Sequence, residues 1–137
     1  MGRSVGAVKN LQHHALAALR RQGLHLGIVS NIDDDQFQPL WERIGLGPQF
    51  DAVTTSEEAR SCKPHPGIYR HALGKAGDLS PEEVVFVGDS LEFDVAGANA
   101  IGMTTVLIGE PPSQAEADGD PDYVIETIPE LLQIIGA

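Results

Sequence analysis

The sequence holds a single cysteine, Cys62, which excludes an internal disulfide and a metal site built from a cysteine cluster. Basic residues are scarce too, because 9 Lys and Arg stand against 20 Asp and Glu, for a net charge of −11. Such a charge repels phosphate backbones and anionic lipids, so nucleic acids and membranes are disfavoured as partners. No apolar run approaches the roughly 20 residues of a membrane helix, and the first residues lack the apolar core of a signal peptide. We therefore expect a protein of the reducing cytoplasm.

What the sequence does contain is a regular alternation of short apolar runs and longer amphipathic ones. The 137 residues fit one domain, 1–137, without room for a second core. The predicted helices cover about 5–22, 35–44, 67–77, 93–101 and 127–136, and the predicted strands cover 24–30, 51–56, 84–88, 103–108 and 123–125. Strands that are apolar on both faces and alternate with helices favour an α/β fold with a doubly wound parallel sheet. The run 84–88 is the clearest candidate for a buried strand.

Polar side chains follow the ends of two predicted strands, where ligands bind in doubly wound sheets. Ser30 and Asn31 end the first strand and can bind an anion, although such a pair is also common in simple turns. Lys63 lies in a proline-rich loop and offers a positioned positive charge for phosphate, the alternative being a solvated surface lysine. These residues together predict an anion site.

Two carboxylates follow the strand at 84–88. Asp89 comes directly after Gly88, and Asp94 opens the next predicted helix. At this spacing the two side chains can share a hard cation such as Mg²⁺, which prefers oxygen ligands. Helix capping alone is the alternative, but it does not require the glycines Gly88 and Gly97, which favour close approach of the backbone.

With these residues in this order, the chain resembles the haloacid dehalogenase superfamily of Mg²⁺-dependent phosphatases and dehalogenases. The family's second motif is similar to LGIVSN with Ser30, the third to CKPHPGIY with Lys63, and the fourth to GDSLEFD with Asp89 and Asp94. Further phrases, such as SNIDD and DYVIETIPELL, look most like the phosphatase-rich first subfamily. The resemblance extends from about residue 6 to residue 136 and implies a Rossmann-like α/β core.

Two parts of the family pattern are missing from this sequence. Family members begin with a strand ending in an Asp-x-Asp motif, which supplies the nucleophile and the proton donor, and a helical cap follows it. In the family this strand lies between the strand of Ser30 and the strand of Asp89. Because neighbouring strands are about 4.8 Å apart, its loss leaves a gap of roughly 10 Å between unpaired edges. We expect direct pairing of these two strands, a complementing chain that supplies the missing strand, or a homodimer that buries the edges, and aggregation is the remaining alternative.

The resemblance implies a hydrolase core of the Mg²⁺-dependent phosphatase type that acts on a small phosphorylated metabolite, with dehalogenation as a lesser alternative. It makes Lys63 a catalytic clamp on phosphate, Ser30 and Asn31 further phosphate ligands, and Asp89 and Asp94 ligands of Mg²⁺. Without the missing nucleophile, Lys63 is left to pair with Asp89, and we expect the chain alone to be inactive.

Two other interpretations carry different functions. The first is a non-catalytic module derived from such a phosphatase, which binds an anion and Mg²⁺ or another protein. The second is the receiver domain of a phosphorelay. Receivers place their acidic pair first and their lysine last, and this chain has the opposite order.

Overall fold

A computed structural model of the chain describes residues 14–45, 47–110 and 119–135. The strands are β1 (Gly27–Ser30), β2 (Ala52–Thr55), β3 (Val85–Gly88), β4 (Thr104–Ile108) and β5 (Tyr123–Ile125). The helices are α2 (Asp34–Ile44), α3 (Ser56–Ala59), α4 (Pro66–Lys75), α5 (Ala96–Ile101) and α6 (Leu131–Ile135), preceded by helical residues 14–21. Short 3₁₀ helices are η1 (Gly47–Gln49), η2 (Pro81–Glu83) and η4 (Ile128–Glu130), and η3 (Leu91–Val95) is a π-helix.

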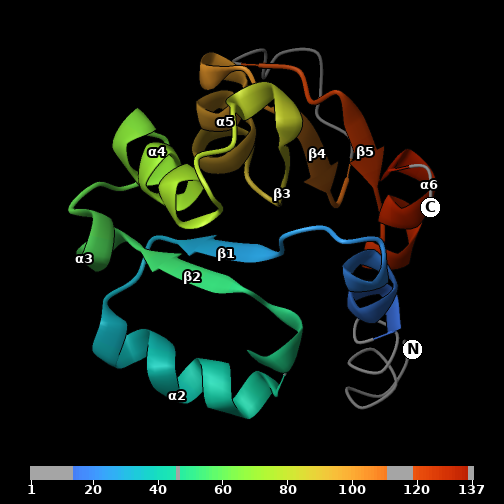
Figure 1. Cartoon of the computed structure of the whole chain (residues 1–137). Coiled ribbons are helices and arrows are strands. Elements are labelled where there is room, and N and C mark those ends of the chain that lie inside the picture. Colours follow the sequence, from blue (N-terminus) through green and yellow to red (C-terminus); the bar gives the residue numbers. More distant parts are fainter. Residues whose placement is uncertain (1–13, 46, 111–118, 136–137) are drawn as a thin grey trace.

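All described strand pairs are parallel, as the sequence predicts, but they form two sheets. One sheet has the order β1-β2 and the other has the order β3-β4-β5 (Figure 1). Ser30 lies opposite Thr55 in the first sheet, and Gly88 lies opposite Leu107 in the second. Of the ways to resolve the predicted gap, direct pairing of β1 with β3 is therefore wrong for the described residues. Other elements, not a strand ladder, hold the two sheets together.

Two apolar clusters connect the sheets from opposite sides. In the first, Leu16 and Leu19 of the N-terminal helical residues pack with Val106 of β4, and Leu26 joins them from the segment before β1. In the second, Ile68, Tyr69 and Leu73 of α4 pack with α5, and they meet Val29 of β1 and Phe86 of β3. Helices thus lie on both sides of the parallel strands, which agrees with the predicted doubly wound arrangement. In Figure 1, α4 and α5 lie above β1, and α2 lies below β2.

The burial of the strands differs from the expectation. The run 84–88 is predicted to be the most buried strand, yet β3 is only half-buried and Val85 is 37% exposed. β4 is the buried strand instead, with Thr105, Val106 and Leu107 inside. The reason is topological, because among the described strands β4 has a paired strand on each side whereas β3 has one only on its β4 side.

Several boundaries also differ from those predicted. The first strand begins at Gly27 and not at residue 24, and the predicted helix 93–101 begins at Leu91 with the π-helical turn η3. The elements η1 and α3 are absent from the prediction. The predicted helical residues 5–13 and the acidic loop at 111–118 lie outside the described residues. The capping boxes expected at Ser80 and Thr127 are both present.

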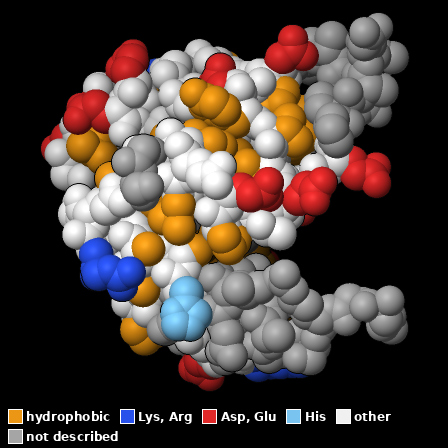
Figure 2. All heavy atoms as spheres, turned by 90° about the vertical axis from the view of Figure 1, so that its right-hand side faces the viewer, with side chains coloured by type: hydrophobic (Ala, Val, Ile, Leu, Met, Phe, Trp, Pro, Cys, Tyr) orange, Lys and Arg blue, Asp and Glu red, His pale blue; other side chains and the backbone are white. Residues whose placement is uncertain are grey.

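The surface is acidic with small apolar areas. Figure 2 shows hydrophobic side chains in the middle of one face and acidic side chains around them, along the top and on the right side. Tyr123 and Val124 of the outer strand β5 are 47% and 40% exposed. None of the described helices is long and apolar enough to cross a membrane.

Candidate active site at the carboxyl ends of β1 and β3

Lys63 is tied to the end of β1 through its backbone. Its N–H donates to Asn31 Oδ1 over 2.7 Å, and its carbonyl oxygen accepts from Asn31 Nδ2 over 3.0 Å. The peptide bond that follows, to Pro64, is cis. A paired amide contact of this kind holds the loop after α3 in one place. The side chain of Lys63 therefore starts from a defined position beside Asn31.

The ammonium group of Lys63 points to the other sheet. Its Nζ lies 2.6 Å from Oδ1 of Asp94 and 5.9 Å from the ring centre of Phe86 in β3. The side chains of Lys63 and Asp94 are only 13% and 6% exposed. A charge-assisted hydrogen bond between such shielded groups is stronger than one on an open surface. The ion pair joins the carboxyl end of β1 to the carboxyl end of β3.

Asp94 is held by the turn that follows β3. Its Oδ2 accepts from the backbone N–H of Ser90 over 3.1 Å, and the Ser90 hydroxyl accepts from the N–H of Phe93 over 3.1 Å. A Cβ atom at Gly88 would lie 2.3 Å from Cγ of Asp94. Only glycine lets the carboxylate pack this closely on the strand end. The presence of glycine at position 88, which the sequence analysis noted, is thus explained by this close contact.

Tyr69 is a site residue that sequence reasoning missed. It is fully buried on α4, and its hydroxyl donates to the carbonyl oxygen of Phe93 over 2.6 Å. Burial, and secondarily the charge of Asp94, raises the pKa of the Tyr69 hydroxyl above its usual value. A Cβ atom at Gly97 would lie 2.3 Å from the Tyr69 oxygen. From the sequence, Gly97 indicates that another group packs closely on this helix, but the sequence does not identify that group as the Tyr69 side chain.

The structure brings together some of the predicted site residues more closely than others. Asn31, Lys63 and Asp94 form one connected chain of contacts, and Ser30 is the half-buried last residue of β1. Asp89 directly follows β3 and is exposed. The expected ion pair of Lys63 with Asp89 is wrong, because the lysine pairs with Asp94.

The carboxylates of Asp89 and Asp94 are ligands of the kind that Mg²⁺ prefers. Asp94 packs against Gly88, the residue before Asp89, so both acids lie at the end of β3. Proteins commonly hold Mg²⁺ through one or two carboxylates, with water and substrate oxygens completing the shell. Within the described residues no three side chains of His, Cys, Asp or Glu gather as a complete metal site. The oxygen donors thus fit the ion in kind, and further ligands must come from water, substrate or another chain segment.

Comparison with known proteins bears on this geometry. Residues 7–102 match the family model of haloacid dehalogenase-like hydrolases. The chain belongs to this family. A glyceraldehyde 3-phosphate phosphatase from Methanocaldococcus jannaschii is 37% identical in an alignment of 124 positions that covers 88% of this chain and 53% of that protein. A ribulose-1,5-bisphosphate 5-phosphatase from Halopiger xanaduensis is 34% identical in an alignment of 128 positions that covers 88% of this chain and 53% of its own length.

Solved structures of the haloacid dehalogenase-like family share the fold. A phosphatase of this family from Thermococcus onnurineus superposes with a TM-score of 0.77 at 37% identity, covering 89% of this chain and 55% of its own. An L-2-haloacid dehalogenase from Xanthobacter autotrophicus gives a TM-score of 0.78 at 27% identity, covering 91% of this chain and 59% of its own. The predicted Rossmann-like α/β core is therefore confirmed. The chain spans about half the length of the relatives that it matches.

Proposed function

We propose that this chain is the phosphate- and Mg²⁺-binding core of a phosphomonoester hydrolase. The observation that carries the proposal is Lys63, whose side chain is 13% exposed: Asn31 holds its backbone at the end of β1, and Asp94 holds its ammonium at the end of β3. A shielded lysine charge binds a phosphoryl oxygen more strongly than a solvated one, because less water competes with it. A dianionic phosphate at this position would draw the ammonium away from a single carboxylate.

The end of β1 supplies neutral donors beside this charge. Ser30 offers a hydroxyl, and Asn31 offers its own backbone N–H in the turn after β1. Together with Lys63 they would bind separate oxygens of one phosphoryl group and orient it. Hydrogen bonds between the Asn31 side chain and the Lys63 backbone hold the turn after β1 and the loop of Lys63 in a fixed relative position.

Asp89 and Asp94 are the proposed Mg²⁺ ligands. The bound ion would polarise the phosphoryl oxygens and offset the charge that builds up on them. Asp94 has a second task in this chain, because its Oδ1 also holds the Lys63 ammonium in place. Asp89 is exposed and has more freedom to meet an ion from solution.

The names of the relatives point to the substrate class. They are phosphatases of glyceraldehyde 3-phosphate, of ribulose-1,5-bisphosphate and, at 31% identity, of phosphoglycolate. Each name refers to a small phosphorylated metabolite. We place the substrate of this chain in the same class, and its reaction in the cytoplasm.

Catalysis needs a nucleophile that the described site does not provide. Of the acidic residues after Ser30, Asp34 accepts a 2.5 Å hydrogen bond from the Thr55 hydroxyl, and Asp33 is the N-cap residue of α2, although its side chain makes no capping hydrogen bond. The chain alone should therefore bind phosphate and Mg²⁺ without turning over. A non-catalytic anion-binding module is the second candidate, and the closed ion pair of Lys63 with Asp94 favours it.

The test combines binding with turnover. Isothermal titration with inorganic phosphate in the presence of Mg²⁺ is compared for the native chain, Lys63→Ala and Asp89→Asn, beside hydrolysis of p-nitrophenyl phosphate. We expect phosphate binding that Lys63→Ala abolishes and Asp89→Asn weakens, with background hydrolysis for all three proteins. Phosphate binding that survives Lys63→Ala would refute the proposed site. Hydrolysis that both substitutions abolish would show that the chain has a nucleophile of its own.

A further inference from the structure

The turn η3, which carries Asp94, is wound more loosely than an α-helix. The N–H of Val95 donates to the carbonyl oxygen of Ser90 over 3.1 Å, five residues back. The N–H of Ala96 donates in the same way to the carbonyl oxygen of Leu91. An α-helix joins residues four apart, and turns with the wider spacing are rare and occur frequently at functional sites. The direction of the Asp94 side chain therefore depends on this π-helical winding.

Rewinding η3 into an α-helix would turn Asp94 away from its present position. Each residue of an α-helix turns the chain by about 100°, so loss of the extra residue would rotate the turn by about that angle relative to α5. Asp94 Oδ1 lies 2.6 Å from Lys63 Nζ, and its Oδ2 accepts from the Ser90 N–H, so both contacts need the present rotation. The interactions that hold the turn in its π-helical form thus also hold the ion pair of Lys63 with Asp94.

The Tyr69 hydroxyl lies at the point where the two windings differ. In an α-helix the carbonyl oxygen of Phe93 would accept from the N–H of Gly97, four residues on. In this structure the Tyr69 hydroxyl donates to that oxygen over 2.6 Å. It also lies against Gly97, since a Cβ atom there would be 2.3 Å from the Tyr69 oxygen. The hydroxyl thus supplies a donor to Phe93 from another helix, and it lies beside the residue that would supply the α-helical donor.

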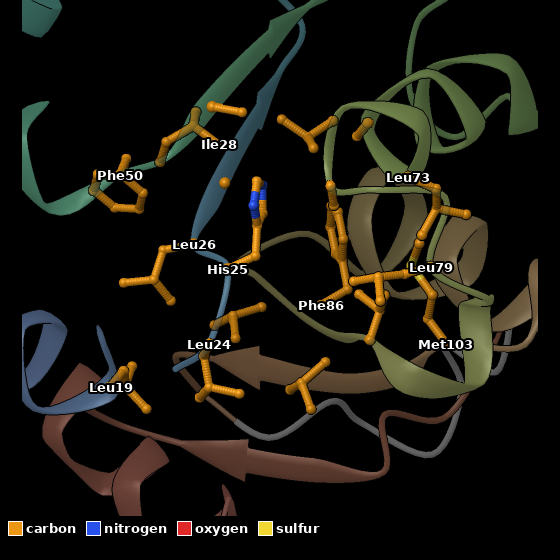
Figure 3. A pocket seen from close by; sticks show the side chains of 18 of the residues that line it. Leu19, Leu24, His25, Leu26, Ile28, Phe50, Leu73, Leu79, Phe86 and Met103 are labelled. Carbon is orange, nitrogen blue, oxygen red and sulfur yellow. The ribbon is translucent and has the colours of Figure 1, made fainter. Parts of the chain in front are cut away.

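The ring of Tyr69 is fixed against β3. Tyr69 is fully buried, and its ring meets the Phe86 ring edge-on, with ring centres 5.1 Å apart and planes at 66°. Both residues line an apolar cavity of about 640 Å³ that separates β1 from β3, and Figure 3 shows Phe86 among the lining side chains. Aromatic pairs at this distance and angle attract one another. The hydroxyl therefore reaches Phe93 from a ring that has little freedom to move.

The start of α4 connects Tyr69 to the loop of Lys63. This helix begins three residues after Lys63, and the N–H of Ile68 in its first turn donates to the Ser61 hydroxyl oxygen over 3.1 Å. Tyr69 is the next residue of the chain after Ile68. One short helix thus binds the Lys63 loop at its start and the turn of Asp94 through Tyr69.

We propose that Tyr69 is a positioning residue for the pair of Lys63 and Asp94. Its hydroxyl holds the Phe93 carbonyl so that η3 keeps its π-helical winding, and this winding directs Asp94 to Lys63. Tyr69→Phe would preserve the ring packing and remove only the hydrogen bond. A turn held in this way also sets the position of Asp94 for Mg²⁺, and this consequence alone rests on the proposed function.

The test measures the coupling between Lys63 and Asp94 with and without the Tyr69 hydroxyl. Urea denaturation of Lys63→Met, Asp94→Asn and the double variant gives the coupling energy in the native chain, and the same substitutions are then made in Tyr69→Phe. We expect the coupling to fall by at least about half in the Tyr69→Phe background. A tyrosine that only stabilises the fold would lower every stability equally and leave the coupling unchanged. Equal coupling in the two backgrounds would therefore overturn the proposal.

A matched substitution checks the role of this particular hydroxyl. Tyr123 is the other tyrosine of the chain, and it lies 47% exposed on the outer strand β5. Tyr123→Phe makes the same chemical change without touching η3, so we expect the native coupling between Lys63 and Asp94 in that background. A similar loss of coupling in Tyr123→Phe would contradict the role assigned to Tyr69.

Amide hydrogen exchange followed by NMR gives an independent result on Tyr69→Phe alone, which decides the matter if the multiple variants do not fold. The N–H groups of Ser90 and Val95 report on η3, and that of Val106 reports on the buried strand β4. We expect exchange at Ser90 and Val95 to become about three- to tenfold faster relative to Val106, the factor that corresponds to one hydrogen bond. An unchanged ratio to Val106 would indicate at most a global loss of stability and would overturn the proposal.

Failure of this proposal and failure of the proposed function can be told apart. Isothermal titration with Mg²⁺ in the presence of inorganic phosphate is compared for the native chain, Tyr69→Phe and Tyr123→Phe. We expect about three- to tenfold weaker Mg²⁺ binding in Tyr69→Phe only. If the coupling falls in Tyr69→Phe but the native chain binds neither Mg²⁺ nor phosphate, only the proposed function fails. If the native chain binds both ions and the coupling is the same in both backgrounds, only the positioning proposal fails.

Discussion

Breaking the ion pair between Lys63 and Asp94 should destabilise the protein more than removing the whole pair. Asp94→Asn leaves a lysine charge with 13% exposure and no opposite charge, and Lys63→Met leaves a carboxylate with 6% exposure that keeps the Ser90 N–H as a donor. Removal of one partner of a fully buried pair costs about 3–5 kcal/mol. Since Lys63 retains some contact with water, we expect about 2–4 kcal/mol for each single variant.

The double variant, Lys63→Met with Asp94→Asn, carries no unpaired charge. The methionine keeps the apolar stem near Phe86, and the asparagine keeps an acceptor for Ser90. Its cost should therefore be about 1–2 kcal/mol, below that of either single variant, which gives a coupling energy of about 2 kcal/mol or more.

Urea denaturation followed by circular dichroism measures these free energies, and thermal unfolding gives an independent value. With an unfolding entropy of about 2.1 cal/mol/K per residue, a chain of 137 residues should lose about 7–14 °C of Tm in each single variant. The refuting result is additivity within about 0.5 kcal/mol, because that would mean the two side chains do not interact in solution.

Three further predictions concern other parts of the molecule. Gly97→Ala places a Cβ atom 2.3 Å from the Tyr69 oxygen and should cost about 1–3 kcal/mol in urea denaturation, so an unchanged midpoint would contradict the close packing. The hydrogen bond from Lys75 lowers the pKa of Glu58 from 4.5, so its stabilising effect is present above that pH and lost as the pH falls. The stability difference between the native chain and Glu58→Gln should thus shrink below about pH 4.5, and a constant difference across an acid titration would exclude this effect. Ser80→Ala removes the capping box of η2 and should cost about 1 kcal/mol by thermal unfolding, whereas Ser80→Thr should cost less.

Much of the fold could be predicted from local patterns. The five strands and the helices α2 and α4 follow from apolar periodicity, and the capping boxes at Ser80 and Thr127 follow from side-chain spacing. These features depend on residues within a few positions of each other, so one sequence is enough to predict them. The prediction that β3 is a buried strand was wrong, because the burial of a strand depends on which other strands lie beside it.

The candidate site shows the same division. Sequence order and glycine spacing predicted that Ser30, Asn31, Lys63, Asp89 and Asp94 gather at the strand ends. The choice of Asp94 over Asp89 as the partner of Lys63 depends on how the π-helical turn η3 directs its side chains, and no local pattern describes that turn. Tyr69 was missed for a related reason, since its contact with Phe93 joins two helices 24 positions apart.

Composition and short-range spacing are enough to predict the parallel α/β character of this protein, its acidic surface and the family motifs at its strand ends. The separation of β1 from β3 and the apolar cavity between them, in contrast, follow only from the folded arrangement. The physical reason is that strand pairing and cavity formation depend on contacts between segments far apart in the chain. Helices on both sides hold these two strands at a distance that neither strand's own residues specify.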